Sequence, residues 1–321
     1  MTANLVDTEC VEATEQACHD PVRNRSAAMK RARALLATLS LLLVFPASGR
    51  ATPPAARPLA PLAELQGRCA ADCPRAVRVD LAIQRAAVWL AGYPDDLQFD
   101  AAVLLSLIRA HVDSAELRTA FARARTRADH DHDHPHRRLW ATDMISPPEH
   151  TSRWQAPAPG AARVNTNRVL SEALHCRENG WRELTENYAC GAMRDTGGYH
   201  TTHAIWSLDI ARRNGCTVAD ECLASLRAEL LAAQPAELRA KSTLEIDLYA
   251  ERAVMLLRTG TAASAASGWV DALLGLQRAD GSWGAGTDPV PYYRYHATAA
   301  VVWALAEWSK ERGQPSPTPQ P

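Results

Sequence analysis

Histidine and carboxylate side chains recur at helical spacings in the second half of this 321-residue chain. His200 and His203 are three residues apart, Asp247 and Glu251 are four residues apart, and His296 adds a third imidazole. Residues three or four apart share one face of a helix, so each pair could present two ligands to one ion. Mixed imidazole and carboxylate ligands suit zinc best, and they also suit iron, manganese or copper. The sequence therefore predicts a divalent-metal site whose ligands are His200, His203, Asp247 and His296.

Carboxylates in and near this set could move protons during a reaction. Asp100, Asp247 and Glu251 are candidates for a general base, or for contacts that orient the ligands. A structural interpretation competes, because an Asp at a helix start is often only an N-cap and a single His is often only a hydrogen-bonded structural residue. A further interpretation is a metal-free His–Asp pair that transfers protons.

The candidate residues occupy similar places in a repeated pattern. A bulky apolar residue, then Asp or His, then an apolar helix occurs at Phe99-Asp100, Tyr199-His200, Ile246-Asp247 and Tyr295-His296. The intervals are 100, 47 and 49 residues, so the first interval spans two units and one unit is hidden. Apolar residues at helical spacing predict helices over 82–90, 101–110, 114–125, 201–212, 220–232, 248–258, 269–277 and 298–308.

The end of the chain carries a recognisable turn. Gln277-Arg-Ala-Asp280-Gly281-Ser-Trp283-Gly284 resembles the Gln…Gly-x-Trp repeat of squalene–hopene cyclases and the similar turns of protein prenyltransferase β-subunits. A second segment, Asp195-Thr-Gly197-Gly-Tyr199, resembles the same turn motif more weakly. The resemblance implies an all-α fold in which helical hairpins close into an α/α toroid, with the N-terminal ends of the inner helices at the mouth of a cavity. It also implies that Gln277 and Trp283 tie hairpins together.

The chemistry of these families does not carry over to this chain. The Asp-x-Asp-Asp acid segment of the cyclases is absent. The chain has only three Phe, whereas a cavity that guides carbocations is rich in aromatic rings. The resemblance therefore implies the fold, and a divergent terpene cyclase is the weakest functional alternative.

Two further segments carry polar groups. In the toroid, Arg194 and Asp195 would lie at the cavity rim beside Gly197-Gly198, so we predict that they contact substrate. The run from His130 to His136 alternates His with Asp inside a long loop at 126–161. Its composition indicates loose affinity for transition metals or, more simply, a solvated polar loop.

The N-terminal part is typical of a secretory signal. A basic run starts at Met29, an apolar run covers 34–45, and small residues follow at 47–49. The apolar run is shorter than the roughly 20 residues that span a bilayer, so we expect export to the periplasm or medium without a stable membrane anchor. The predicted parts are a leader and signal at 1–49 with Met29 as a candidate start, a Pro/Ala-rich linker at 50–65, a toroid-like domain at 66–312, and a disordered tail at 313–321.

Cysteine usage agrees with export. Six cysteines follow the signal, and an even number in an exported chain predicts disulfides. They are Cys69, Cys73, Cys176, Cys190, Cys216 and Cys222. Fifteen pairings exist, of which the pairing of chain neighbours, with Cys176 joined to Cys190, is the simplest. The net charge of −1 gives no electrostatic reason to expect nucleic acid as a partner.

Together these features predict a metal-assisted hydrolase or lyase that acts outside the cytoplasm on an unidentified small molecule or polymer. Similar α/α barrels serve sugar-polymer lyases and hydrolases, so by analogy a polysaccharide or peptidoglycan fragment is a candidate substrate. The alternative from another class is a non-catalytic binding or scaffold protein, in which a ring of hairpins presents a concave surface and the histidines are structural.

Overall fold

The computed structural model describes residues 56–69, 73–93, 99–128, 139, 164–235, 238, 242–285 and 291–313. These residues belong to one compact unit, Thr52–Pro321, and are mostly helical, which confirms the all-α prediction. Two short parallel strands, β1 (Arg57–Pro58) and β2 (Val112–Asp113), pair with each other. Within the described residues, no helix has the length and apolar character needed to cross a membrane.

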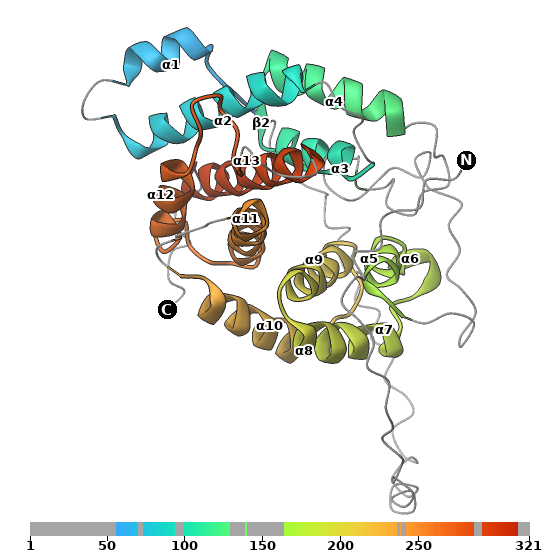
Figure 1. Ribbon diagram of the computed structural model, residues 1–321. Helices are drawn as coiled ribbons and strands as arrows, with labels where there is room; N and C mark the ends of the chain where they lie inside the picture. The colour runs from blue at the N-terminus through green and yellow to red at the C-terminus, as the bar shows by residue number, and fades with distance from the viewer. Residues whose placement is uncertain are drawn as a thin grey trace, which may run out of the picture. The chain divides into compact units, whose positions relative to one another are not determined.

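Five helices form an inner row. In spatial order they are α3 (Phe99–Arg109), α13 (Pro291–Gly313), α11 (Thr243–Arg258), α9 (Tyr199–Arg213) and α5 (Thr166–Leu174), and each packs on the next (Figure 1). Helix α13 lies at the centre of the packing, between α2 and α3 on one side and α11 on the other. It is buried over most of its circumference between residues 295 and 308, as expected of a helix that is apolar all round.

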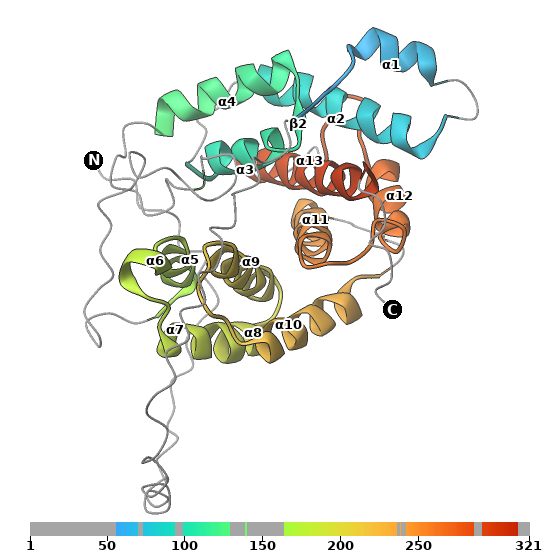
Figure 2. The same cartoon turned by 180° about the vertical axis from the view of Figure 1, so that it is seen from behind.

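Outer helices cover this row, and the view from behind shows the same two layers (Figure 2). Each outer helix precedes an inner helix in the chain, so the unit of the fold is a helical hairpin. The outer helices are α2 (Arg75–Gly92), α4 (Ala115–Ala128), α7 (Glu183–Tyr188) with the π-helical turn η3 (Ala189–Met193), α10 (Asp220–Ala233) and α12 (Ser267–Gly275). The remaining helices are the short α1 (Leu62–Arg68), α6 (Cys176–Asn179) and α8 (Arg194–Thr196).

A chain of buried charges fixes the register of the inner helices. Arg258, near the end of α11, donates from Nη2 to Asp209 Oδ2 on α9 at 2.7 Å and from Nη1 to Glu307 Oε1 on α13 at 2.9 Å. Both steps join residues 49 apart. His111, just after α3, lies 3.0 Å from the same Glu307 oxygen and is 196 residues away, or four such intervals. Inner helices therefore run parallel, with equivalent residues of the 49-residue repeat side by side.

The Gln277–Gly284 turn has the structural role that the resemblance implied. Gln277 Nε2 donates to the carbonyl oxygen of Ala82 on α2 at 2.8 Å and to that of Gly281 at 3.0 Å. Trp283 is fully buried, and its indole N–H donates to the Leu273 carbonyl oxygen at 2.7 Å. The turn thus ties the last hairpin to the first described one.

Replacing Gly281 by alanine is expected to lower the free energy of unfolding by about 3 kcal/mol, measured by chemical denaturation. Gly281 has φ +91°, and a Cβ built there would lie 2.6 Å from the Arg85 carbonyl oxygen. Gly275 in α12 is the matched control, since a Cβ there meets nothing within 4 Å. Gly275→Ala should be neutral or stabilising, because alanine favours the helix. Equal effects of the two changes would contradict the assigned close approach.

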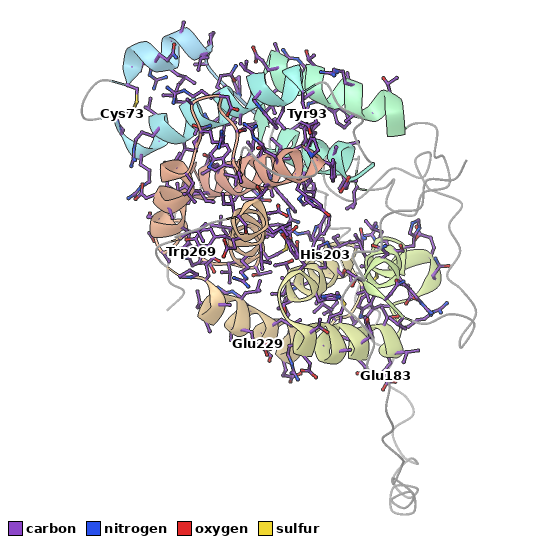
Figure 3. All side chains as sticks on the ribbon, viewed as in Figure 1. Cys73, Tyr93, Glu183, His203, Glu229 and Trp269 are labelled. Atoms are coloured by element: carbon purple, nitrogen blue, oxygen red, sulfur yellow. A yellow bond between two sulfur atoms is a disulfide. The ribbon has the colours of Figure 1, made fainter. Side chains whose placement is uncertain are left out.

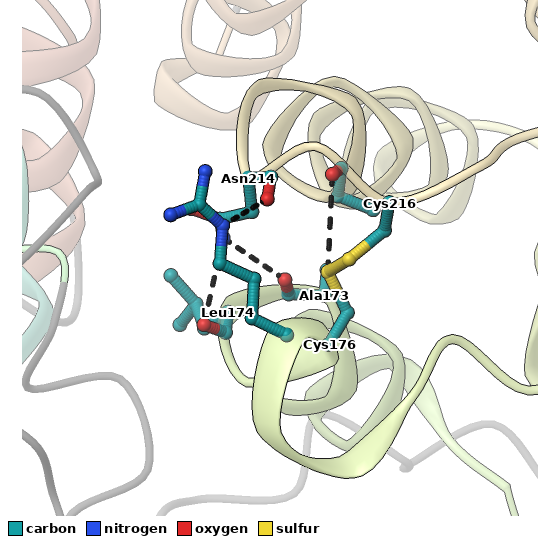
Figure 4. Close-up of a disulfide and its surroundings, with 7 residues drawn as sticks. Ala173, Leu174, Cys176, Asn214 and Cys216 are labelled. Atoms are coloured by element: carbon teal, nitrogen blue, oxygen red, sulfur yellow. Dashed lines mark hydrogen bonds between the residues drawn. A yellow bond between two sulfur atoms is a disulfide. The ribbon is translucent and has the colours of Figure 1, made fainter. Parts of the chain in front are cut away.

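Three disulfides join the six cysteines, and their pairing corrects the prediction in part. Cys69–Cys73 pairs chain neighbours as expected. The other two bonds are Cys176–Cys216 and Cys190–Cys222, so pairing of Cys176 with Cys190 is wrong. The reason is the hairpin packing: Cys176 follows inner helix α5, and Cys216 follows the adjacent inner helix α9 (Figure 4). The bonds indicate an oxidising compartment.

All eight predicted helices are present, and the differences lie elsewhere. Part of the predicted linker at 50–65 is ordered, because β1 pairs with β2, Arg57 forms an ion pair with Asp80 and α1 begins at Leu62. Helix α4 extends to Ala128, inside the predicted loop at 126–161. The predicted signal, the His130–His136 run and the tail beyond Gly313 lie outside the described residues.

Candidate metal centre

Helix α11 positions two carboxylates on its buried face. A capping box starts the helix: Ser242 Oγ accepts from the Glu245 backbone N–H, while the Glu245 carboxylate accepts from the Ser242 backbone N–H. This start places Asp247 and Glu251 one turn apart, with 5% and 8% of their surface exposed. Both face the neighbouring inner helices rather than solvent.

Helix α13 supplies the third member of the group. His296 Nδ1 lies 2.9 Å from Asp247 Oδ1, and these residues are again 49 apart. One ligand atom from each of Asp247, Glu251 and His296 lies within 4.8 Å of the others, and among the described residues this is the one group with metal-site geometry. Three protein ligands from two rigid helices match the ligand number of catalytic zinc sites.

The charge balance separates this group from the other buried carboxylates. Buried Glu172 pairs with Arg168, and buried Asp209 and Glu307 both pair with Arg258. Asp247 and Glu251 form ion pairs only with histidines, and no described Arg or Lys lies within 4.0 Å of either carboxylate. Two carboxylates thus share a buried space in which the described part of the chain supplies no Arg or Lys, an arrangement that is costly unless a proton or a metal ion enters.

The pKa values follow from this balance. Burial raises the pKa of Glu251, an effect that His203 opposes and Asp247 reinforces. Burial lowers the pKa of His296, but the charge of Asp247 and its hydrogen bond outweigh burial and raise that pKa to about 10. Without metal, His296 is therefore a cation that pairs with Asp247, and a bound metal ion would take the place of its proton.

The repeat explains why His200 lies outside the group. Contacts between α9 and α11 join residues 49 apart, so the α9 position equivalent to Asp247 is Gly198. The sequence pattern aligned His200 with Asp247 instead, a shift of two residues. Two residues rotate a helical side chain by about 200°, towards the opposite face. The His200 side chain is accordingly exposed, and the structure does not bring it to the other predicted ligands.

His203 lies beside the group without joining it. It projects from α9 towards the middle of the described helices (Figure 3), and its Nδ1 lies 3.9 Å from Glu251 Oε2. The same Nδ1 is 2.8 Å from the Tyr199 carbonyl oxygen, to which it donates. This hydrogen bond leaves Nε2 as the nitrogen able to accept a proton or a ligand.

Asp100, at the start of α3, approaches the group from the other side. Its charge contributes to the raised pKa of His296, and with burial it raises the pKa of Tyr292 on α13. Asp100 Oδ1 and the Tyr292 hydroxyl are both buried, and neither has a hydrogen-bond partner of normal geometry. The structure therefore places Asp100 near His296, in the position that three intervals of 49 from Asp247 predict.

Arg194 and Asp195 pair with each other. Arg194 Nη2 lies 3.1 Å from Asp195 Oδ1, and Arg194 Nε lies 3.5 Å from Glu229 on α10. Asp195 is exposed, and no described contact joins Arg194 or Asp195 to Asp247, Glu251 or His296. Cavities of about 440 and 540 Å³ lie elsewhere, beside the Cys69–Cys73 loop and the Cys176–Cys216 bond.

Two residues on α9 were not predicted as site residues. The Tyr199 hydroxyl donates to Asp247 Oδ2 at 2.9 Å, and the Thr202 hydroxyl donates to Glu251 Oε2 at 2.6 Å. Burial, and then the charge of Asp247, raise the pKa of Tyr199, so its hydroxyl keeps the proton it donates. The interval of 49 would have placed Thr202 opposite Glu251, but Tyr199 was assigned only to the apolar start of a repeat.

Comparison with known proteins gives no relative. No protein-family model, no curated protein and no solved structure matches this chain. The residues of the site therefore carry the functional argument alone.

Proposed function

We propose that this chain is an exported α/α toroid with a divalent-metal centre held by Asp247, Glu251 and His296, and that it acts as a metal-assisted hydrolase or lyase. The observation that carries the proposal is the pair of buried carboxylates with a histidine within 4.8 Å and, among the described residues, no Arg or Lys within 4.0 Å of them. The buried carboxylates Glu172, Asp209 and Glu307 each have an arginine partner, which Asp247 and Glu251 do not have among the described residues.

The residues present fit zinc in particular. One imidazole and two carboxylates are ligands that zinc accepts, and three protein ligands leave a coordination position open. A bound zinc ion would lower the pKa of a water molecule and polarise a substrate oxygen. Beside it, His203 Nε2 and the Asp100 carboxylate are candidates to accept a proton.

Closure of the inner row and export complete the proposal. The described inner helices run parallel in register, as they do in a toroid, and their N-terminal ends carry the candidate ligands. The positive ends of helices favour carboxylates and anionic substrate groups. Three disulfides support a compartment outside the cytoplasm, in line with the signal-like segment at 29–49.

Metal analysis with a matched pair of histidine variants tests this function. The mature protein, loaded with zinc and dialysed, should retain about one ion per chain. His296→Ala should lose that ion, whereas His200→Ala should keep it, because His200 is exposed and outside the group. Retention of metal by both variants, or absence of metal from the wild type, would overturn the proposal. Metal lost only on deletion of residues 130–136 would assign binding to the His-rich run.

A metal-free proton-transfer site is the second candidate. The hydrogen bond of 2.9 Å between His296 and Asp247 favours it, because such a pair can accept and return a proton. Treatment with a chelator separates the two functions: activity that survives complete removal of metal supports the proton-transfer pair, and activity restored only by zinc supports the metal centre.

A further inference from the structure

Helix α9 contributes two hydroxyl donors to the candidate metal ligands, one to Asp247 and one to Glu251. Tyr199 donates to Asp247 Oδ2 at 2.9 Å, and Thr202, one turn later, donates to Glu251 Oε2 at 2.6 Å. Thr202 is 1% exposed, and Glu251 is 8% exposed. The two hydroxyls thus contact one oxygen of each carboxylate, and the Thr202–Glu251 contact is buried where water could not easily replace it.

These contacts occupy one oxygen of each carboxylate and leave the other oxygen for a different partner. Asp247 Oδ1 faces His296, and Glu251 Oε1 has no hydrogen bond among the described contacts. Hydroxyl donors stabilise a carboxylate and hold its rotamer without adding positive charge. An arginine in the same place would neutralise the carboxylate and compete with a cation, as Arg258 does for Asp209 and Glu307.

We infer that Tyr199 and Thr202 are positioning residues, which orient Asp247 and Glu251 so that each offers one oxygen to a divalent cation. The inference rests on the proposed metal centre. Outer contacts of this kind orient metal ligands, and their loss typically weakens metal binding by about 10- to 100-fold. The role also explains why α9 takes part in the site, although the residue that the 49-residue repeat aligns with Asp247 there is Gly198.

Zinc affinity of four variants, measured by competition with a chromophoric chelator, tests this role. Tyr199→Phe and Thr202→Val should each weaken zinc binding by about 10- to 100-fold while keeping one ion per chain. Thr202→Ser, which retains the hydroxyl, should bind like the wild type. Tyr249→Phe is the structural control, since Tyr249 lies on α11 with two of the ligands, but its hydroxyl donates at 2.9 Å to the Pro235 carbonyl oxygen, outside the group. It should lower the melting temperature and leave zinc affinity unchanged.

The outcomes distinguish failure of this role from failure of the metal centre. If the wild type binds one zinc ion and Tyr199→Phe and Thr202→Val bind it equally tightly, the positioning role is wrong and the metal centre stands. If all variants, including Tyr249→Phe, weaken binding in proportion to lost stability, the effect is structural and the role is again wrong. If the wild type binds no zinc, the metal centre fails and the positioning role fails with it.

Discussion

Replacing Arg258 by methionine is expected to lower the free energy of unfolding by about 3–5 kcal/mol. The side chain is 5% exposed and hydrogen bonds to Asp209 on α9 and Glu307 on α13. Its removal would take away the buried cation that the two carboxylates share, leaving Asp209 with the half-exposed Arg213 and Glu307 with His111, Trp303 and Lys310. The effect should appear in chemical denaturation at neutral pH and low salt.

Arg213 provides the matched control. It also pairs with Asp209, at 2.8 Å, but its side chain is 40% exposed. Arg213→Met should therefore cost no more than about 1 kcal/mol, as is usual for exposed ion pairs. Similar losses for the two variants would show that the register of the inner helices does not depend on the buried bridge through Arg258.

Removing the Cys176–Cys216 disulfide is expected to lower the free energy of unfolding by about 4 kcal/mol. The bond closes a separation of 40 residues and joins the ends of two adjacent inner helices. Beside it, the Asn214 side-chain amide donates to the Ala173 carbonyl oxygen at 3.1 Å, so the two helix ends also share a buried hydrogen bond (Figure 4). The double variant Cys176→Ala, Cys216→Ala would be compared with the wild type by denaturant unfolding.

The Cys69–Cys73 bond is the control for this prediction. It closes a separation of only 4 residues, so its removal should cost about 2 kcal/mol. The expected order is therefore a larger loss for the long loop than for the short one. The reverse order would contradict the expectation that the longer closed loop contributes more to stability.

Helical periodicity predicted the fold class well because it reports on burial. The segments that became α2, α3, α4, α9, α10, α11, α12 and α13 each carry apolar residues that meet the core. The short helices α1, α6, α7 and α8 were not predicted, since three to seven residues are too few for periodicity to be visible. The disulfide pairing depended on which inner helices are neighbours, which the chain order alone does not give.

The candidate site could be predicted only in part from the sequence. The pattern of an apolar residue before Asp or His selected Asp247 and His296, which lie 2.9 Å apart, and Asp100, whose charge acts on His296. It wrongly included His200. A shift of two residues is easy to miss in a sequence alignment, but it turns the side chain by about 200° around a helix. Tyr199 and Thr202 became visible only when hydrogen bonds between α9 and α11 fixed the interval at 49.

Anomalous diffraction from zinc-soaked crystals of the mature protein tests the metal centre most directly. We expect one strong peak at the zinc edge, about 2.0–2.2 Å from a carboxylate oxygen of Asp247, a carboxylate oxygen of Glu251 and a ring nitrogen of His296. A peak that lies elsewhere, or crystals without a peak between α11 and α13 while the Asp247–His296 hydrogen bond of 2.9 Å persists, would contradict it.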